Sequence, residues 1–184
     1  IRETDAIIHV LRCFDNDNIV HVDGSVDPVR DKEIIDTELQ LKDLETIENR
    51  IKRVEKVAKV GGDKQGKSAR TVTFENEDEQ QAAKNLFLLT AKPVLYVCNV
   101  DDTSAAHGNP YVDAVREAIK DENAELLIIS AQTEADIAEL ESYEEKQMFL
   151  EDMGLKESGC DRLIKAIYHL LNLQTFITAG EMEV

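Results

Sequence analysis

The chain has 184 residues, 42% of them hydrophobic and 32% charged, which suits one domain with a modest core and an appendage. Its formal net charge of −17 at pH 7 argues against DNA as a partner, because phosphate backbones would be repelled. No apolar run approaches the roughly 18 residues that a membrane span needs, and no secretory signal opens the chain. We therefore expect a cytoplasmic protein without membrane contact.

The cysteines and histidines show no pattern typical of a metal centre. Cys13, Cys98 and Cys160 are scattered among apolar neighbours, and the four histidines lack ligand spacing. An odd number of scattered cysteines is typical of reduced, partly buried thiols rather than of disulfides. We expect no metal site in this chain.

The first half of the chain predicts one strand followed by a long helical excursion. Residues 6–13 (AIIHVLRC) form an apolar run that suits a strand buried on both faces, and a loop rich in Asp, Asn, Gly and Pro follows over 15–31. From 31 to about 59 no Pro or Gly interrupts, and apolar residues recur at helical spacing: Leu41, Leu44, Ile47, Ile51, Val54 and Ala58. A narrow apolar stripe on a long charged helix predicts a coiled-coil arm over 31–89, packed against a second helix over 75–89.

The second half alternates strands with helices. Strands are predicted over 94–98, 124–129 and 174–178, and helices over 109–120, 133–140, 144–153 and 158–171. Asn109 and Pro110 supply a helix cap and first turn, and Gly154 supplies a helix stop. This alternation indicates an α/β fold with a mostly parallel sheet, in which ligands bind beyond the carboxyl ends of the strands.

One stretch, GGDKQGKS at residues 61–68, has the G-x-x-x-x-G-K-S spacing of a phosphate-binding P-loop. A working P-loop joins a buried strand to a helix N-terminus, so that backbone N–H groups converge on the phosphates. Here a charged helix precedes the glycines, and residues 69–73 (ARTVT) after them carry no helical stripe. We therefore interpret the match as a turn at the tip of the arm.

The segment KPVLYVCNVDD places Asn99 and Asp102 after the second strand, at the spacing of the N-K-x-D element that reads the base in P-loop GTPases. An asparagine amide both donates and accepts hydrogen bonds, and a carboxylate can accept two from the ring N–H and exocyclic amine of guanine. Ser130 and Ala131 follow the next strand and match a short S-A element whose backbone N–H supports the base. Together these four residues predict a purine site at the carboxyl edge of the sheet, although Asn99 is equally explained as a turn-capping amide.

Five sequence blocks cover nearly the whole chain: IRETDAIIHVLRCFDNDNIVHVDGSVDP, ELQLKDLETIE, GGDK, LTAKPVLYVCNVDD and LLNLQTFITAG. They resemble the YchF/Obg-like ATPase family of translation-factor-class P-loop NTPases. The resemblance implies a partial P-loop NTPase G domain over 1–30 and 90–178, interrupted by the α-helical coiled-coil arm at 31–89. It also implies that 179–184 begin a linker to a small β-rich TGS domain.

The resemblance assigns further roles at the base. Val100 stands where a GTPase has lysine and would lie against the base, which its backbone would help to read. Phe14 would form an apolar wall of the base pocket. Asp102 stands where the family usually has glutamate, and aspartate is the guanine-reading residue. Strict preference for adenine is therefore not expected.

The family's P-loop, its Mg²⁺-holding Ser/Thr and its D-x-x-G switch would all lie before Ile1. We therefore expect the Mg²⁺ ligands upstream of Ile1, no catalytic or metal-binding residue in this chain, and no hydrolysis by the chain alone. The family's arm is longer between Gly62 and Ala69, so residues missing from its tip would lie near 66–69.

The leading hypothesis is that this chain is most of the G domain, together with the arm, of a YchF-type NTPase. The intact protein would hydrolyse ATP, with GTP as the other candidate, in association with ribosomes, and the loops of this chain would select the purine. One alternative is a ribosome- or protein-binding module whose arm engages the partner while nucleotide acts only as a conformational switch. Another is a plain GTPase, which would differ only at the base.

Overall fold

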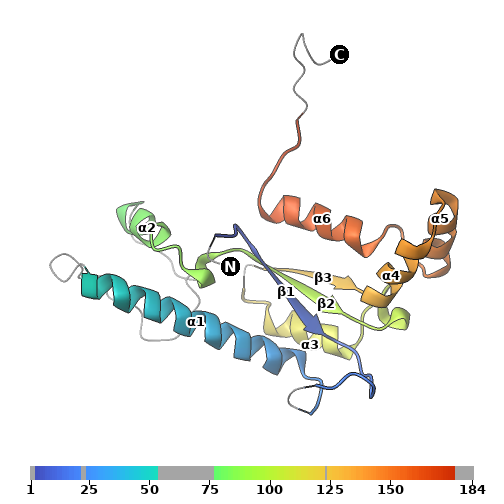
Figure 1. Cartoon of the computed structure of the whole chain (residues 1–184), viewed down its shortest axis with the longest axis horizontal. Coiled ribbons are helices and arrows are strands. Elements are labelled where there is room, and N and C mark those ends of the chain that lie inside the picture. The colour runs from blue at the N-terminus through green and yellow to red at the C-terminus, as the bar shows by residue number, and fades with distance from the viewer. Residues whose placement is uncertain (1–2, 22–23, 54–76, 123, 177–184) are drawn as a thin grey trace, which may run out of the picture.

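A computed structural model of the chain describes residues 3–21, 24–53, 77–122 and 124–176, and Figure 1 shows an α/β arrangement. The elements follow in the order β1 (Ile7–Arg12), α1 (Pro28–Arg53), α2 (Glu77–Lys84), η2 (Leu89–Ala91), β2 (Val94–Asn99), η3 (Asp102–Ser104), α3 (Pro110–Ala118), β3 (Glu125–Ile129), α4 (Ala131–Glu139), α5 (Tyr143–Asp152) and α6 (Gly159–Leu170). The short elements η2 and η3 are 3-10 helices. The predicted α/β class is confirmed.

The three strands form one parallel sheet in the order β1-β2-β3. Ile7 pairs with Val94 at the start of β1, while at its end Arg12 pairs with Asn99, which in turn pairs with Ile129. The strands therefore end at the same level, and the segments that leave them meet at one edge, here called the carboxyl edge. The bounds of all three strands agree with the predicted ones to within one residue.

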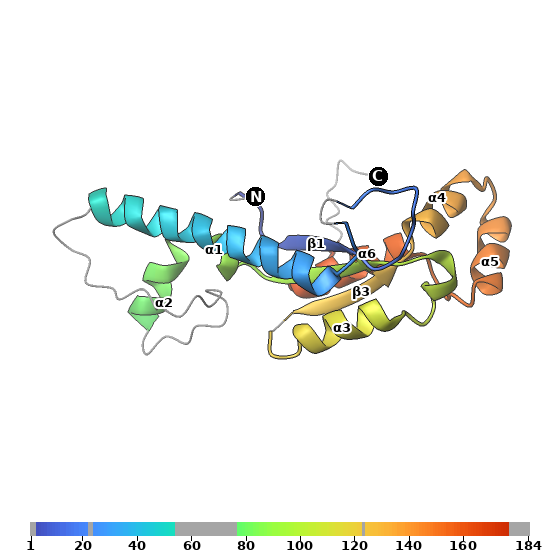
Figure 2. The ribbon, with the colours of Figure 1, turned by 90° about the horizontal axis from the view of Figure 1, so that it is seen from below.

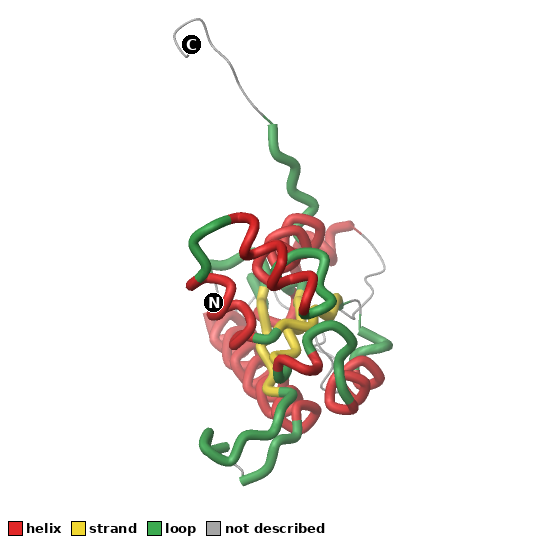
Figure 3. The backbone as a smooth tube through the Cα atoms, turned by 90° about the vertical axis from the view of Figure 1, so that its right-hand side faces the viewer, coloured by secondary structure: helices red, strands yellow, loops and turns green. Residues whose placement is uncertain are grey.

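Helices cover both faces of the sheet, as Figures 1 and 3 show from two directions. On one face α3 packs over the larger core cluster, which contains Leu11, Cys13, Val94, Tyr96, Cys98, Val100, Val112, Val115 and Ile119. On the other face the apolar side of α6 packs over Leu95, Val97 and Ile129. β2 is thus buried on both faces, which its uninterrupted apolar sequence favours.

β1 departs from the prediction that both of its faces are buried. Ile8 is 44% exposed and Val10 is 61% exposed, whereas Leu11 on the opposite face is only 2% exposed. α6 packs over β2 and β3 and leaves this face of β1, an edge strand of the described sheet, open. The prediction was wrong because an apolar run does not reveal whether a helix covers each face of its strand.

α1 begins at the carboxyl edge and runs back past the opposite edge of the sheet, so its second half projects from the domain (Figures 1 and 2). Its 26 residues span about 39 Å. The long predicted helix is confirmed as far as Arg53, while the rest of it and the GGDKQGKS match lie outside the described residues. Leu41 and Leu44, from the predicted apolar stripe, are 59% and 51% exposed, and the coiled coil stays a prediction.

The caps of the later helices follow the sequence signals. The Asn109 side chain accepts a hydrogen bond from the first turn of α3, where Pro110 lies. Gly154 follows α5 with a φ of +70°, a conformation that favours glycine.

The strand predicted over 174–178 is not formed in its described part, because residues 174–176 run as irregular chain with no strand beside them there.

The thiols of Cys13 and Cys98 lie together in the core, whereas Cys160 is exposed. A hydrogen bond with Cys98, reinforced by burial, holds the pKa of Cys13 far above its ordinary value. We expect a thiol reagent to modify Cys160 in the native protein, slowly because Glu134 raises its pKa, and the buried pair only after unfolding. Peptide mapping after native and denaturing labelling checks this, and fast native labelling of Cys13 would contradict it.

Candidate functional site

Backbone hydrogen bonds join the segments that leave the three strands at the carboxyl edge. The N–H of Cys13 donates to the carbonyl oxygen of Asn99 at 2.8 Å, and the N–H of Val100 donates to that of Ile129 at 2.9 Å. Asn109 Nδ2 donates to the Cys13 carbonyl oxygen at 2.7 Å, which ties the segment after β1 to the start of α3. These bonds extend the sheet by one step and bring the loop after β2 beside the loop after β3.

Asn99 connects the end of β2 to the N-terminus of α4. Its Oδ1 accepts a hydrogen bond of 3.0 Å from the N–H of Ala131, the first residue of that helix. This N–H is one of the backbone donors that a helix leaves unpaired at its start. With Oδ1 occupied, Nδ2 is the group of this half-buried side chain that can donate to a ligand. The capping interpretation of Asn99 and the base-binding one are thus compatible.

Two hydroxyl groups from the start of α4 hold the carboxylate of Asp102. Ser130 Oγ donates to Asp102 Oδ1 at 2.6 Å, and Thr133 Oγ1 donates to the same oxygen at 3.0 Å. Ser130 and Thr133 are 2% and 1% exposed, whereas Asp102 is half-buried. Ser130 Oγ also accepts from the N–H of Thr133 at 3.2 Å and so caps α4. Asn99, Asp102, Ser130 and Ala131 therefore lie together, as their spacing predicts.

Thr133 is a member of this cluster that the sequence pattern does not single out. The signal lies in the helix cap, because the third residue after an N-cap has its backbone N–H and side chain next to the cap hydroxyl. With Ser130 as the N-cap, a hydroxyl at position 133 reaches the same carboxylate as the cap does. Finding it requires knowing that α4 begins at Ala131, two residues before the predicted start.

Asp101 has a different role from Asp102, although the two are adjacent. Its Oδ1 accepts from Thr103 Oγ1 at 2.7 Å and from the N–H of Ser104 at 2.9 Å, which caps η3. The bond from the Thr103 hydroxyl, followed by that from Ser104, holds the pKa of Asp101 below its ordinary value. Asp101 therefore shapes the turn after β2, while Asp102 bonds to α4.

Phe14 and Val100 occupy the same edge in different ways. The ring centroid of Phe14 lies 4.9 Å from Cζ of Arg12, and Arg12 Nε donates to the Phe14 carbonyl oxygen at 3.1 Å. Val100 is 3% exposed and packs in the larger core cluster. Because its side chain is buried there, a contact between Val100 and a base would come from its backbone.

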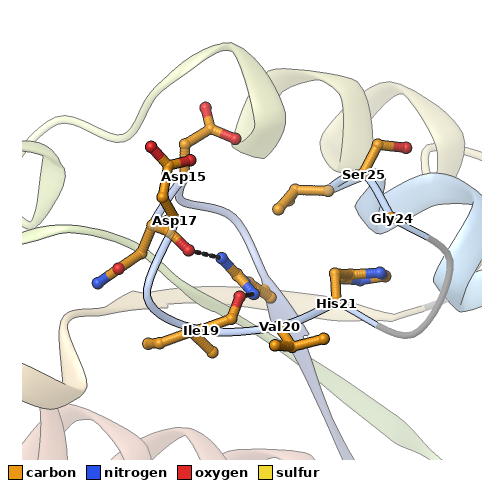
Figure 4. A pocket seen from close by; sticks show the side chains of 10 residues that line it. Asp15, Asp17, Ile19, Val20, His21, Gly24 and Ser25 are labelled. Carbon is orange, nitrogen blue, oxygen red and sulfur yellow. Dashed lines mark hydrogen bonds between the residues drawn. The ribbon is translucent and has the colours of Figure 1, made fainter.

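A cavity of about 310 Å³ lies beside this edge, in the loop between β1 and α1. Arg12 holds the loop by donating to three of its backbone carbonyl oxygens, those of Phe14, Asn16 and Ile19, at 3.1, 3.1 and 2.9 Å. Figure 4 shows Asp15 and Asp17 on one side of the cavity and His21 and Ser25 on the other. None of the six predicted site residues lines this cavity, so the cavity and the predicted base site are separate features of one edge.

The part of the chain that the structure describes contains no group of three or more His, Cys, Asp or Glu side chains that could hold a metal ion. None of the described helices has the length and apolar character needed to cross a membrane.

Comparison with known proteins shows to which family the chain belongs. It is 50% identical over 203 aligned residues to the ribosome-binding ATPase YchF of Bacillus subtilis (strain 168) and 46% identical over 200 to that of Escherichia coli O157:H7, and both alignments cover all of it. The structure of the Schizosaccharomyces pombe YchF GTPase matches 98% of the chain with a TM-score of 0.81 and 27% identity. The chain belongs to the YchF family. No family model matches the sequence.

The chain spans about half the length of these YchF proteins, namely 55% of the B. subtilis protein, 54% of the E. coli protein and 53% of the S. pombe chain. The family resemblance inferred from the five sequence blocks is confirmed. The alignment with the B. subtilis protein covers all of this chain but is longer than it, 203 against 184 residues. The B. subtilis protein therefore carries internal residues that this chain lacks. The predicted place of such a difference, near 66–69, lies outside the described residues.

Proposed function

We propose that this chain is the purine-recognising part of a YchF-type nucleotide hydrolase whose substrate is ATP or GTP. The observation that carries the proposal is the convergence of the loops after β2 and β3, where Asn99 bonds to Ala131 and Asp102 bonds to Ser130. An amide and a carboxylate are thereby held close together at the edge where parallel α/β sheets bind ligands. The family membership supports a nucleotide as that ligand.

The existing hydrogen bonds define what each polar group can still do. Asn99 Nδ2 can donate to an acceptor such as N7, which adenine and guanine share. Asp102 Oδ2 accepts no hydrogen bond from any described residue and can accept one from a purine amine. Phe14 can supply an apolar surface for the flat base, since bases stack on aromatic rings, and the backbone of Val100 can line the same site.

Phosphate chemistry is assigned to residues outside this chain. In P-loop NTPases, Mg²⁺ supplies positive charge that stabilises the reacting phosphates, and residues outside this chain would hold it. We propose no catalytic residue and no metal ligand within the chain, whose loops select and hold the base. The chain by itself is then expected to leave ATP and GTP unhydrolysed.

Association with ribosomes is proposed from the similarity to the B. subtilis and E. coli YchF proteins, which are ribosome-binding ATPases. It would place this protein in the cytoplasm. A partner-binding module is a second candidate function, because α1 projects from the domain with Leu41 and Leu44 exposed. In either case the functional units are a base-binding domain over 1–30 and 90–178 and an arm over 31–89.

Asn99→Ala in the full-length protein is expected to weaken binding of both ATP and GTP roughly tenfold, because it removes a donor and leaves the Ala131 N–H unpaired. Titration with fluorescent nucleotide analogues gives the two values of Kd. Asn85→Ala, at an exposed asparagine just beyond α2, is the matched control and should leave both unchanged.

If Asn99→Ala bound ATP and GTP as tightly as the wild type, the base would not bind at this edge. If ribosome co-sedimentation nevertheless persisted and neither nucleotide were hydrolysed, the partner-binding module would become the better account.

A further inference from the structure

The contact between Thr133 and Asp102 has a consequence for which purine the site accepts. Thr133 Oγ1 and Ser130 Oγ both donate to one oxygen of the carboxylate, Oδ1, at 3.0 and 2.6 Å. Both hydroxyl groups are buried, so they do not exchange this partner for water. Each hydroxyl has a single proton, and each proton is used in this contact.

An ionised carboxylate offers about four acceptor positions, two on each oxygen. With Ser130 alone, Oδ1 would keep one position free. With Thr133 added, both positions on Oδ1 are filled, and only Oδ2 remains to meet a ligand. Asp102 therefore faces the carboxyl edge as a one-oxygen acceptor.

Purine bases differ in what they offer to such a group. Guanine presents two adjacent donors, its ring N–H and its exocyclic amine, and a carboxylate with two available oxygens pairs with both at once. Adenine presents a single exocyclic amine as donor beside a ring nitrogen that only accepts. A one-oxygen acceptor gives adenine its one bond, but it denies guanine the second.

We propose that Thr133 is a positioning residue that determines base specificity: by filling Asp102 Oδ1 together with Ser130, it removes the advantage that an aspartate at position 102 would give guanine nucleotides. The proposal rests on the proposed function, since it requires a purine at this edge. It explains how an aspartate in the place of the family's usual glutamate remains compatible with adenine nucleotides.

Thr133→Val in the full-length protein tests the proposal, because valine keeps the shape of threonine and lacks its hydroxyl group. With Oδ1 partly released, the ratio of Kd for GDP to Kd for ADP is expected to fall roughly tenfold. Thr133→Ser keeps the hydroxyl and should retain the original ratio. Thr133→Ala also removes the hydroxyl and replaces the valine variant if that variant does not fold.

A purely structural role for Thr133 would change both affinities together and leave their ratio unchanged. An unchanged ratio in Thr133→Val or Thr133→Ala overturns the inference while the proposed function stands, provided that Asn99→Ala still weakens binding of both nucleotides. If Asn99→Ala has no effect either, no purine lies at this edge, and both proposals fail.

Discussion

Replacing Lys32 with methionine is expected to lower the local free energy of unfolding by about 3 kcal/mol. Lys32 is 5% exposed, and its Nζ lies 2.6 Å from Oε1 of Glu122 and 2.7 Å from Oδ2 of Asp36. Methionine resembles lysine in length but carries no charge. It would leave two half-buried carboxylates close together without the cation that compensates them.

The contacts of Lys32 and Glu122 join three parts of the fold: α1, β2 and the segment before β3. Lys32 lies on α1, with Nζ 5.4 Å from the ring centroid of Tyr96 in β2, and Tyr96 Oη donates to Oε2 of Glu122 at 2.9 Å. Glu122 belongs to the segment between α3 and β3. Burial raises the pKa of Tyr96 above its ordinary value, so its hydroxyl remains a donor. Loss of the ammonium group should therefore loosen β2 as well as α1.

The effect of Lys32→Met should not depend on pH near neutrality. Burial lowers the pKa of Lys32, but hydrogen bonds to Asp36 and Glu122 outweigh this and raise it above the ordinary 10.5. A raised pKa means that the stabilisation is complete below 10.5 and is lost only as pH rises through the folded-state value. The difference from the wild type should be constant between about pH 6 and 9.

Native-state hydrogen exchange of the β2 amides in the full-length protein measures the Lys32→Met effect. Lys120→Met is the matched control, because Lys120 forms an exposed ion pair with Glu117, and such pairs contribute about 0.5 kcal/mol or less. Equal exchange rates in the two variants would show that the Lys32 ion pairs do not hold α1 to the sheet.

Features that depend on neighbouring residues could be predicted from the sequence, whereas the long-range partners of buried charges could not. The apolar runs gave the strands, and Asn109 with its following proline gave the start of α3. Lys32 and Asp43 were not singled out, because on a charged helix a buried charge has the same local pattern as a solvated one. Only the fold reveals that Asp43 meets a partner 47 residues away.

In the candidate site, too, some residues could be predicted from the sequence and others could not. Asn99 and Asp102 follow a strand that the sequence identifies well, so their place at the carboxyl edge could be predicted. Thr133 could not be singled out, because its role depends on the first turn of α4. The sequence also could not show that the side chain of Val100 is taken up by the core, since an apolar residue after a strand fits either a core or a ligand pocket.

Asp43→Ala is expected to have an effect of similar size, lowering the local free energy of unfolding around η2 by about 3 kcal/mol. Asp43 is 5% exposed and lies on α1, where its carboxylate accepts three hydrogen bonds. They come from the N–H of Leu89 at 2.7 Å and from the N–H and hydroxyl of Thr90, both at 2.8 Å. Alanine would remove the carboxylate that accepts all three of these hydrogen bonds.

Asp43 is therefore the second residue of α1, after Lys32, that attaches this helix to the rest of the fold. It holds η2, the segment that leads from the arm into β2. Hydrogen exchange in Asp43→Ala should show faster exchange of the Leu89 and Thr90 amides, which lie next to the carboxylate, before any change at the far end of β2. Glu48→Ala, at an exposed acid on the same helix, should leave these amides protected. If Asp43→Ala left them equally protected, water or another group would be replacing the carboxylate, and Asp43 would not attach α1 to η2. If instead Lys32→Met and Asp43→Ala both weaken protection along β2, a force on the part of α1 beyond Asp43 would reach the strand that ends at Asn99, because both attached residues lie between that part and the start of the helix at the carboxyl edge.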